Sequence, residues 1–512
     1  MEKYQHMSKI EYIIIQAGGK GTRLGQLTHN KPKGIVPVNN LPIIFHLFRQ
    51  YSDKKFIVIG DYKHEVLEEY LESFCDAQYM TVKATGNGTC AGIKDAINLI
   101  PSNTPFMLVW SDLILDKAID IDNCSSGNYI GISKDFECRW SFKNGECIEE
   151  RSKEHGIAGL FIFQDKSVID DVPVEGELVR WFSSKKDISF HELSLEHTRE
   201  IGTIIAYEQN HKSEYTCRPF NRMEIKGSSI TKIPIDAQGE TLAVRERNWY
   251  REVKGYGFDQ IPMIYSLEPL TMEKIDGVNI FRTDLTGDQK KIVIDNLVDS
   301  LDKLHGYKSV EADPYSCMEA YYGKTVKRLN KVRDLIPFAN SEYITINGRK
   351  YKNPYRYKNT VRKLVKDKLC MCSEFVLIHG DCTFSNTMVN DSLDVTFLDP
   401  RGYFGNTEMY GDAYYDWAKL YYSVEGDYDR FNNKEFALDI DMDKSEVKMD
   451  IKTNGWRDVS EYLLSKISDC DSDRVKLIHA IIWLSLTTYA WEDYDSICGA
   501  FYKGTMLLDE FL

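Results

Sequence analysis

The stretch Ile13-Ile14-Ile15-Gln16-Ala17-Gly18-Gly19-Lys20-Gly21-Thr22-Arg23-Leu24 runs an apolar strand directly into a glycine-rich loop. Glycine lets the backbone bend sharply and approach an oxygen-bearing ligand closely. The N–H groups exposed at such a turn form a concave cradle for anions. We therefore predict a triphosphate site at the start of an α/β fold, with Arg23 neutralising charge and the cradle formed by Ala17, Gly18, Gly19, Gly21 and Thr22.

The wider pattern is Gly-Gly-x-Gly-x-Arg followed about ten residues later by Pro32-Lys33. This spacing resembles the fingerprint of the sugar-nucleotidyltransferase superfamily, and the resemblance covers roughly residues 10–207. It implies that Lys33 contacts phosphate and acts with Arg23 in catalysis. The short domain also resembles choline-phosphate cytidylyltransferases of bacterial surface-decoration pathways in size, which implies CTP as the nucleotide.

Across the first ~210 residues, short apolar runs alternate with helical patterns, as in a parallel sheet covered by helices. Strands are predicted at 12–16, 55–59, 80–83, 106–110, 129–132 and 156–163, and helices at 43–51, 63–73, 92–100 and 176–185. A polar stretch at 208–217 then predicts a boundary. We expect a Rossmann-like nucleotidyltransferase domain over residues 1–210.

Polar residues follow two of these predicted strands. Asp112, after Trp110-Ser111, lies where a parallel sheet places its ligands and where the family holds Mg²⁺; the alternative is a turn-capping carboxylate. Asn87, Gly88 and Thr89 lie where the family contacts the base; the alternative is an ordinary turn. The second metal-binding Asp of larger family members is missing from 199–203, where Glu200 could replace it.

A second motif lies far downstream: His379-Gly380-Asp381-Cys382-Thr383-Phe384-Ser385-Asn386, followed by Phe397-Leu398-Asp399-Pro400-Arg401-Gly402. Phosphoryl transfer needs a carboxylate near the acceptor hydroxyl and cations on the phosphate oxygens. Asp381 and Asn386 have the interval of the base and the metal-binding Asn in protein-kinase catalytic loops. A hairpin after Asn386 would return Asp399 beside it, so both could hold Mg²⁺.

This motif resembles the aminoglycoside phosphotransferase and choline kinase superfamily, over about 218–512. The resemblance implies a two-lobed (α+β) protein-kinase-like domain at 211–512, with a small lobe at about 218–273 and a helical lobe at about 274–512. Asp381 would be the catalytic base, and Lys232 with Glu246 the ATP-binding pair, although Lys226 or Glu252 could be the true members. Leu270-Thr271-Met272-Glu273 resembles the adenine-binding hinge, which adds Met272 and Glu273 to the nucleotide site. His379 and Asp416 are expected to support the loop.

Composition limits the remaining possibilities. The chain has 512 residues, 43% of them hydrophobic, and a formal charge of −14, which argues against nucleic acid as a partner. Twelve scattered cysteines predict reduced thiols without a disulfide or structural metal. No apolar run is long enough to span a bilayer, and 1–6 lack a secretory signal. We expect a cytoplasmic enzyme, which could form a homodimer.

A kinase makes the phosphomonoester that a nucleotidyltransferase consumes. The sequence therefore predicts a bifunctional Mg²⁺-dependent enzyme that phosphorylates a small alcohol with ATP and then attaches a nucleotide, CMP from CTP, for surface polysaccharide or lipid decoration. Aromatic residues of the helical lobe could box choline by cation–π contacts or could pack the core. A sugar kinase coupled to a sugar-1-phosphate nucleotidyltransferase and a nucleotide sensor with one inactive site are the alternatives.

Overall fold

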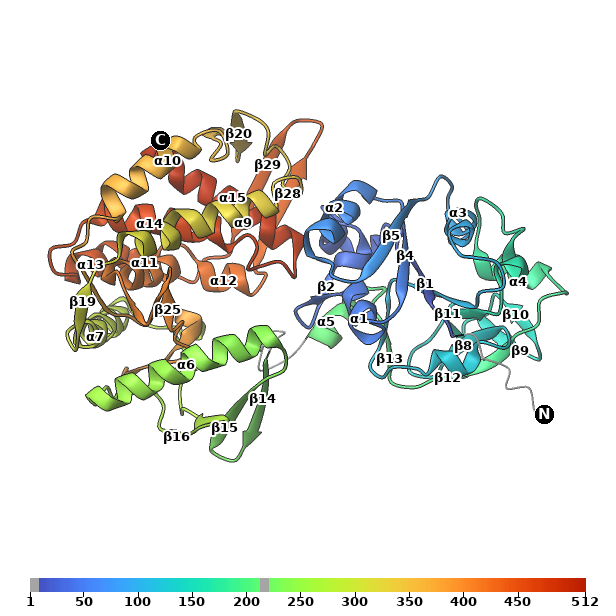
Figure 1. The fold of residues 1–512 in the computed structure, drawn as a ribbon, viewed down its shortest axis with the longest axis horizontal. Helices are drawn as coiled ribbons and strands as arrows, with labels where there is room; N and C mark the ends of the chain where they lie inside the picture. The colour runs from blue at the N-terminus through green and yellow to red at the C-terminus, as the bar shows by residue number, and fades with distance from the viewer. Residues whose placement is uncertain (1–8, 212–220) are drawn as a thin grey trace. The chain divides into compact units, whose positions relative to one another are not determined.

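The computed structural model describes residues 9–211 and 221–512, so the predictions for residues 1–6 and for part of the boundary at 208–217 lie outside the described residues. The chain divides into two compact units (Figure 1). The first comprises Met1–Thr216 with Glu492–Tyr494, and the second comprises Cys217–Trp491 with Asp495–Leu512. Within the described residues, no helix combines the length and the apolarity needed to cross a membrane.

The N-terminal unit is built on a mixed sheet whose main path runs β10-β9-β11-β6-β1-β4-β5, with β8 and β12 beyond β11. Its strands are β1 (Tyr12–Gln16), β4 (Lys55–Gly60), β5 (Gln78–Lys83), β6 (Phe106–Trp110), β8 (Tyr129–Ser133), β9 (Ser141–Lys143), β10 (Glu146–Ile148), β11 (Gly156–Phe163) and β12 (His191–Leu195). The six strands predicted from the sequence are all present. Strands β6, β1, β4 and β5 pair in parallel.

The expectation of a wholly parallel sheet is wrong for β11, which pairs antiparallel with both β6 and β8. The cause is the length of the connections. Between β8 and β11 the chain contains only the short hairpin strands β9 and β10, with no crossover helix. Parallel neighbours need a crossover of a dozen or more residues, whereas antiparallel strands accept a short link.

Helices cover both faces of this sheet, which gives it a buried core on each side. They are α1 (Ile43–Gln50), α2 (His64–Phe74), α3 (Ile93–Asn98), α4 (Leu178–Ser184) and α5 (Ile204–His211). Phe48 of α1 packs edge-on against Phe56 of β4, with ring centroids 4.7 Å apart. The neighbouring Ile57 faces the other side and shares a core cluster with residues of α3 and α4. This alternation is the two-residue period of a strand.

Shorter elements complete the unit: β2 (Pro37–Val38), β3 (Leu41–Pro42), β7 (Leu113–Leu115), β13 (Thr198–Glu200), and the 3₁₀ turns η1 (Thr22–Thr28), η2 (Lys33–Ile35), η3 (Ile121–Cys124) and η4 (Lys166–Ile169). Strand β13 pairs antiparallel with β7, so that Glu200 lies opposite Leu113. This pairing brings Glu200 to the segment that follows Asp112.

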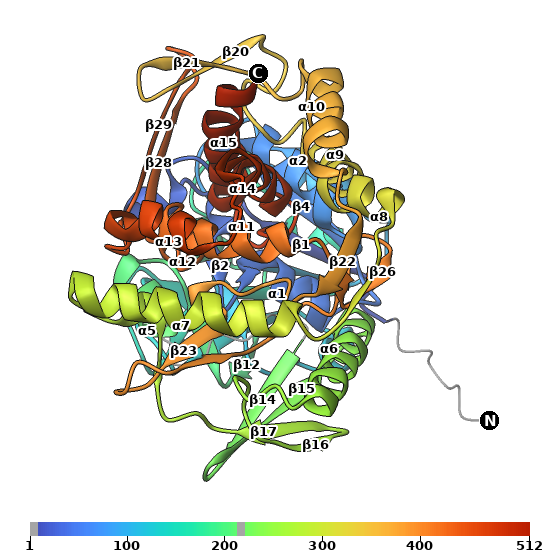
Figure 2. The ribbon, with the colours of Figure 1, turned by 90° about the vertical axis from the view of Figure 1, so that its left-hand side faces the viewer.

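The C-terminal unit begins with a four-stranded antiparallel sheet in the order β14-β15-β17-β16, along which α6 lies (Figure 2). These elements are β14 (Asn221–Lys226), β15 (Ser229–Pro234), α6 (Ala237–Tyr256), β16 (Ile264–Leu267) and β17 (Leu270–Glu273). Strands β14 and β15 pair antiparallel as a hairpin. The Asp236 side chain accepts a hydrogen bond from the Gly239 N–H and caps the start of α6.

The remainder of the unit is mainly helical. Its helices are α7 (Gly287–His305), α8 (Pro314–Met318), α9 (Lys324–Lys331), α10 (Lys358–Leu364), α11 (Ala413–Val424), α12 (Tyr428–Asn432), α13 (Ser460–Lys466), α14 (Ser472–Leu486) and α15 (Tyr494–Leu508), with shorter turns at η5 (Ile280–Arg282), η6 (Glu319–Gly323), η7 (Val365–Leu369), η8 (Phe384–Asn386), η9 (Arg457–Val459) and η10 (Asp509–Phe511). Helix α11 is buried along most of its length and packs against α14.

Short strands join these helices. They are β18 (Val278–Asn279), β19 (Ser309–Glu311), β20 (Tyr343–Ile346), β21 (Arg349–Lys352), β22 (Glu374–Leu377), β23 (Thr387–Val389), β24 (Val395–Phe397), β25 (Tyr403–Phe404), β26 (Thr407–Glu408), β27 (Tyr410–Gly411), β28 (Phe436–Asp441) and β29 (Glu446–Ile451). The charge-rich segment 439–449 lies within the β28–β29 hairpin of the sheet β21-β20-β29-β28. Its inward residues, such as Val447, are buried.

Gly159 leaves room in the sheet for the ring of Trp110, which lies two residues before Asp112. It lies at a register shift in β11 with φ +87°, and an added Cβ would stand 2.1 Å from the Trp110 ring. We predict that Gly159→Ala destabilises the N-terminal unit by about 1–3 kcal/mol from backbone strain and by about as much again from crowding. Chemical denaturation measures the free energy of unfolding. Gly145→Ala is the matched control, since Gly145 has φ +83° with nothing within 4 Å. Equal losses in the two variants would contradict the crowding at Trp110.

Candidate active sites

The predicted residues of the N-terminal unit gather at the carboxyl ends of its parallel strands. The Ala17 N–H donates to the Ile59 carbonyl oxygen at 2.8 Å, and the Ser111 N–H donates to the Gln16 carbonyl oxygen at 3.2 Å. The ends of β1, β4 and β6 are therefore tied together where the glycine-rich loop begins. In open α/β sheets this edge is where ligands bind.

The glycine-rich loop needs glycine at two positions. A Cβ on Gly18 would lie 2.9 Å from the Asp61 Cβ, and Gly21 has φ +65° in the left-handed region. The Gly21 carbonyl accepts from the Leu24 N–H and the Thr28 hydroxyl, which closes the loop onto η1. Gly19, Thr22 and Arg23 are exposed. The loop thus has a fixed base and an open outer face.

Lys33, Asp112, Glu200 and Arg23 lie together beside this loop. The Lys33 ammonium forms an ion pair with the Asp112 carboxylate, and the Arg23 Nη2 lies 3.8 Å from the Glu200 Oε1. Burial raises the pKa of Glu200, and the charge of Asp112 raises it further. A cation bound between two carboxylates that share a site in this way would offset the repulsion between their negative charges.

This donor set fits Mg²⁺, which proteins bind through one or two carboxylates together with substrate phosphates. Asp112 would be one oxygen ligand and Glu200 could be the other. Glu200 was considered as a replacement for the missing second aspartate, and its placement near Asp112 agrees with that idea. In the described part of the chain no group of three or more His, Cys, Asp or Glu side chains could hold a metal ion by itself.

Asn87, Gly88 and Thr89 are also fixed at this edge. The Gln16 side-chain amide donates to the Thr89 carbonyl at 2.9 Å, and the Thr89 hydroxyl accepts from the Leu178 N–H at the start of α4. Gly88 has φ +88°, and an added Cβ would lie 2.5 Å from the Gly176 carbonyl oxygen. The segment is therefore a closely packed loop between β1 and α4, more constrained than an isolated turn.

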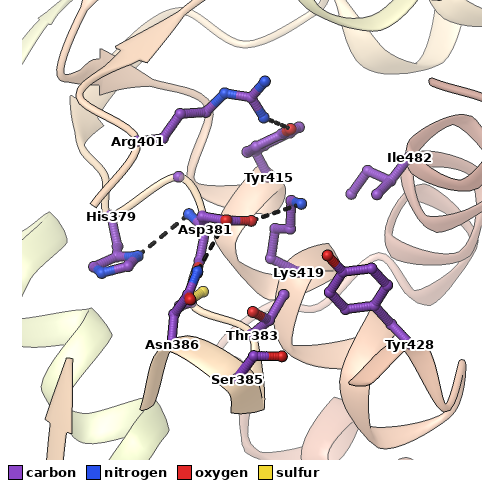
Figure 3. A network of polar contacts seen from close by, with 12 residues as sticks. His379, Asp381, Thr383, Ser385, Asn386, Arg401, Tyr415, Lys419, Tyr428 and Ile482 are labelled. Atoms are coloured by element: carbon purple, nitrogen blue, oxygen red, sulfur yellow. Dashed lines mark hydrogen bonds and ion pairs between the residues drawn. The ribbon is translucent and has the colours of Figure 1, made fainter. Parts of the chain in front are cut away.

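In the C-terminal unit, Asp381 and Asn386 lie in direct contact (Figure 3). The Asn386 Nδ2 donates to both the main-chain oxygen and the Oδ2 of Asp381, at 2.9 Å each. The amide oxygen of Asn386 is consequently turned away from Asp381. The predicted hairpin is confirmed by the pairing of β23 with β24, and the Leu398 N–H donates to the Asn386 carbonyl at 2.8 Å. Asp399 follows directly, with φ +54°.

Asp416 holds the loop that carries Asp381. Its buried carboxylate accepts from the His379 and Gly380 N–H groups at 2.8 and 2.7 Å and contacts the His305 Nε2 at 3.1 Å. The His379 Nδ1 accepts from the Asp381 N–H at 3.2 Å. Burial lowers the pKa of His379 and so favours its neutral form, which matches an orienting role. His305 is part of this support.

Lys232 connects the small sheet to the catalytic loop. Its Nζ lies 2.9 Å from the Glu246 Oε2 and 3.0 Å from the Asp399 Oδ1. Burial alone would lower the pKa of Lys232. The negative charges of Asp399 and Glu246 outweigh this effect and hold the pKa of Lys232 well above its usual value. Burial also raises the pKa of Glu246 to about 7. Of the candidate pairs, Lys232 and Glu246 meet, whereas Lys226 pairs with Glu224 and Glu252 contacts Tyr256 and Tyr410.

Asn386 and Asp399 fit a second Mg²⁺ site, since each offers an oxygen and the two are brought together by the hairpin.

Met272 and Glu273 differ from the expectation that their backbone groups are free to bind adenine. Strand β17 is paired on both sides, with β15 and β16, and the Glu273 N–H donates to the Met263 carbonyl at 2.9 Å. The backbone groups of Met272 and Glu273 form hydrogen bonds within the sheet, so an extended segment that binds adenine would have to begin after Glu273.

Lys419 is a functional residue that was not predicted from the sequence. Its Nζ lies 2.8 Å from the Asp381 Oδ1, and the side chain is almost fully buried in α11. Burial alone would raise the pKa of Asp381, but the Lys419 ammonium outweighs it, so the pKa lies below its usual range. The signal was present in the sequence, because Lys419 follows Asp416 by three residues and lies on the same side of a helix.

Comparison with known proteins locates one family in the N-terminal unit. Residues 12–123 match the family model described as Nucleotidyl transferase. Bifunctional protein GlmU of Methanococcus maripaludis is 30% identical over 110 residues, which are 21% of this chain and 26% of that protein. Glucose-1-phosphate cytidylyltransferase of Salmonella typhimurium is 41% identical over 64 residues, 12% of this chain and 25% of that protein. The chain thus spans about a quarter of the length of the curated relatives it matches.

Part of the chain is also similar to solved structures. HddC from Yersinia pseudotuberculosis is 20% identical, covers 39% of this chain and 98% of its own, and gives a TM-score of 0.33. CTP:phosphocholine cytidylyltransferase from Streptococcus pneumoniae is 18% identical, covers 39% of this chain and 97% of its own, and gives a TM-score of 0.31. On the strength of the sequence match, the N-terminal unit contains a nucleotidyltransferase domain.

Proposed function

We propose that this chain is a bifunctional enzyme that phosphorylates a small alcohol with ATP and then transfers a nucleotidyl group to the resulting phosphomonoester. The observation that carries the first step is the Lys232 ammonium, held within 3.0 Å of both Glu246 and Asp399 from two different parts of the unit. The second step is supported by the match of residues 12–123 to the nucleotidyl transferase family.

In the kinase step, the acceptor hydroxyl attacks the γ-phosphorus of ATP, the bond to the β-phosphate oxygen breaks, and ADP leaves. Asp381 takes the hydroxyl proton, which its ionised state permits near neutral pH. Lys232 places a positive charge on the phosphates, and Glu246 keeps Lys232 in position. Mg²⁺ held by Asn386 and Asp399 would neutralise the β- and γ-phosphate oxygens.

In the nucleotidyl step, an oxygen of the phosphomonoester attacks the α-phosphorus of a nucleoside triphosphate and pyrophosphate leaves. The N–H groups of the loop that contains Gly18, Gly19 and Gly21 cradle the phosphates. Lys33 and Arg23 stabilise the charge that develops on the α-phosphate. Mg²⁺ at Asp112 and Glu200 would supply further charge neutralisation. Asn87, Gly88 and Thr89 would contact the base.

The proposed nucleotide is CTP, so that the product is a CDP-linked molecule for surface polysaccharide or lipid decoration. A relative named for cytidylyl transfer to glucose 1-phosphate supports this choice of base. The same relative also supports the second candidate, in which a sugar is phosphorylated and then converted to a nucleotide sugar. ATP, CTP and the alcohol with its phosphomonoester are the substrates of the proposal, in a cytoplasmic protein that could form a homodimer.

The two steps should be separable by substitution. We predict that Asp381→Asn lowers ADP release by roughly 100- to 10,000-fold, because a general base is lost, and leaves pyrophosphate release from a ready-made phosphomonoester unchanged. Asp112→Asn should lower pyrophosphate release by roughly 100-fold or more and leave ADP release unchanged. Coupled assays with the four nucleoside triphosphates and a panel of phosphomonoesters measure both rates.

Exposed aspartates supply the controls for these two substitutions. Asp443→Asn and Asp170→Asn alter aspartates on the surface of the respective units and should change neither rate. Loss of both activities in Asp381→Asn would contradict two independent sites. An unchanged nucleotidyl rate in Asp112→Asn would rule out the metal assignment.

Lys419→Met should move the pH dependence of the kinase step. With the ammonium gone, burial remains and raises the pKa of Asp381, by roughly 1–3 units when an opposite charge at this distance is removed. The base is then protonated over a wider acidic range, so the acidic limb of kcat/KM shifts to higher pH. The exposed Lys350→Met serves as the control. An acidic limb that stays in place would show that Asp381 is not the titrating base.

A further inference from the structure

A group of cations lies near Asp381. It comprises Lys324 and Arg328 of α9, Arg401 from the loop after Asp399, and Lys419 of α11, and we call it the cationic cluster. Figure 3 shows Arg401 and Tyr415 on the opposite side of Asp381 from Asn386, with Lys419 next to the Asp381 carboxylate. Arg401 and Lys419 therefore lie near the Asp381 carboxylate, beside which an acceptor hydroxyl would bind.

Tyr415 is the common neighbour of the cluster. The Arg401 Nη1 donates to the Tyr415 hydroxyl at 2.6 Å, and the Lys324 Nζ lies 5.7 Å from the centroid of the Tyr415 ring. The Lys419 Nζ lies 6.0 Å from the same centroid. Three positive charges thus converge on one buried ring next to the catalytic carboxylate.

Most of these charges lack an acidic partner. Among residues 9–211 and 221–512, neither Lys324, Arg328 nor Arg401 has a carboxylate oxygen within 4 Å. Lys324 and Arg328 are also four residues apart on one helix, an arrangement of like charges that destabilises the helix. Burial, followed by the charges of Arg401, Arg328 and Lys419, holds the pKa of Lys324 well below its usual value. In a chain with a net charge of −14, such a concentration of cations calls for an anion.

The aromatic rings near this site do not form an empty box for a cation. The guanidinium groups of Arg245 and Arg401 lie 4.4 and 4.7 Å from the Tyr403 centroid, and the Lys419 Nζ lies 5.2 Å from the Tyr422 centroid. The faces of these rings already meet the protein's own cations. A quaternary ammonium bound here would add another positive charge to a site that already holds several positive charges without acidic partners.

We propose that the alcohol phosphorylated at Asp381 carries an anionic group, a carboxylate or a phosphate, which binds between Lys324, Arg328 and Arg401. The inference rests on the proposed kinase function and narrows its acceptor. Lys419 remains paired with Asp381 and keeps the base ionised beside the bound anion. The phosphomonoester delivered to the nucleotidyl step would then retain a second negative charge.

The test is ADP release by the full-length protein with Mg²⁺, ATP and acceptors matched in size but different in charge. One series is glycerate, glycerol 3-phosphate, glycerol and choline; a second is a hexuronate, a hexose 6-phosphate, the neutral hexose and the hexosamine. We expect kcat/KM for an anionic member to exceed that of its neutral counterpart at least roughly 30-fold, as for a desolvated charge pair. The carboxylate and phosphate members distinguish the two sources of charge.

Substitutions in the cluster separate acceptor binding from ATP binding. Lys324→Gln and Arg328→Gln should each raise the KM for the anionic acceptor at least roughly 30-fold and leave the KM for ATP unchanged. The exposed Lys327→Gln on the same helix is the matched control and should change neither. A rise in the KM for ATP alone would assign the cluster to the nucleotide and overturn the inference.

The remaining outcomes are equally decisive. Faster turnover of choline, the hexosamine or a neutral alcohol would overturn the anionic acceptor and leave the kinase function in place. No ADP release with any member of either series would contradict the kinase function itself, and the inference would fall with it.

Discussion

Carboxylates held against lysines organise both units. Asp112 meets Lys33, Asp399 and Glu246 share Lys232, and Asp381 meets Lys419. A carboxylate removed from water loses several kcal/mol of solvation, and removing one partner of a buried pair costs about 3–5 kcal/mol. Such pairs are weak contributors to stability, but Lys419 and Lys232 outweigh burial and hold the pKa values of Asp381 and Asp399 below their usual range. Phosphate chemistry requires ionised carboxylates next to cations.

The two units solve this problem with different backbones. In the N-terminal unit the parallel strands end together, so that Ala17, Ser111 and Asp112 reach one edge of a single sheet. In the C-terminal unit the β23–β24 hairpin instead returns Asp399 to Asn386. Asp416 fixes the catalytic loop by accepting hydrogen bonds from two of its successive N–H groups, a role that a strand plays in the N-terminal unit. The placement of charge is similar although the supporting elements have nothing in common.

Much of this arrangement could be predicted from the sequence, because it depends on local rules. The apolar run into Gly18 and Gly19, the interval between Asp381 and Asn386, and the hairpin after Asn386 are set by nearby residues. The antiparallel course of β11 was missed because strand direction depends on the length of connections, and β9 and β10 are too short to stand out. Lys419, Lys324 and Arg328 were missed because each looks like an ordinary helical cation. Only tertiary packing brings Lys419 and Lys324 to the Tyr415 ring. Met272 and Glu273 were placed by resemblance, which did not show that β17 is paired on both sides.

The central claim is that one chain makes a phosphomonoester at one site and consumes it at the other. The most direct measurement is a single incubation of the protein with an alcohol acceptor, CTP and ATP carrying ¹⁸O in its γ-phosphoryl group, followed by mass spectrometry of the nucleotide-linked product. The account predicts that the heavy oxygens appear in the phosphoryl group joined to the acceptor, because the phosphomonoester formed from ATP attacks the α-phosphorus of CTP. A nucleotide-linked product without heavy oxygen, or heavy phosphomonoester that accumulates without conversion, would contradict it.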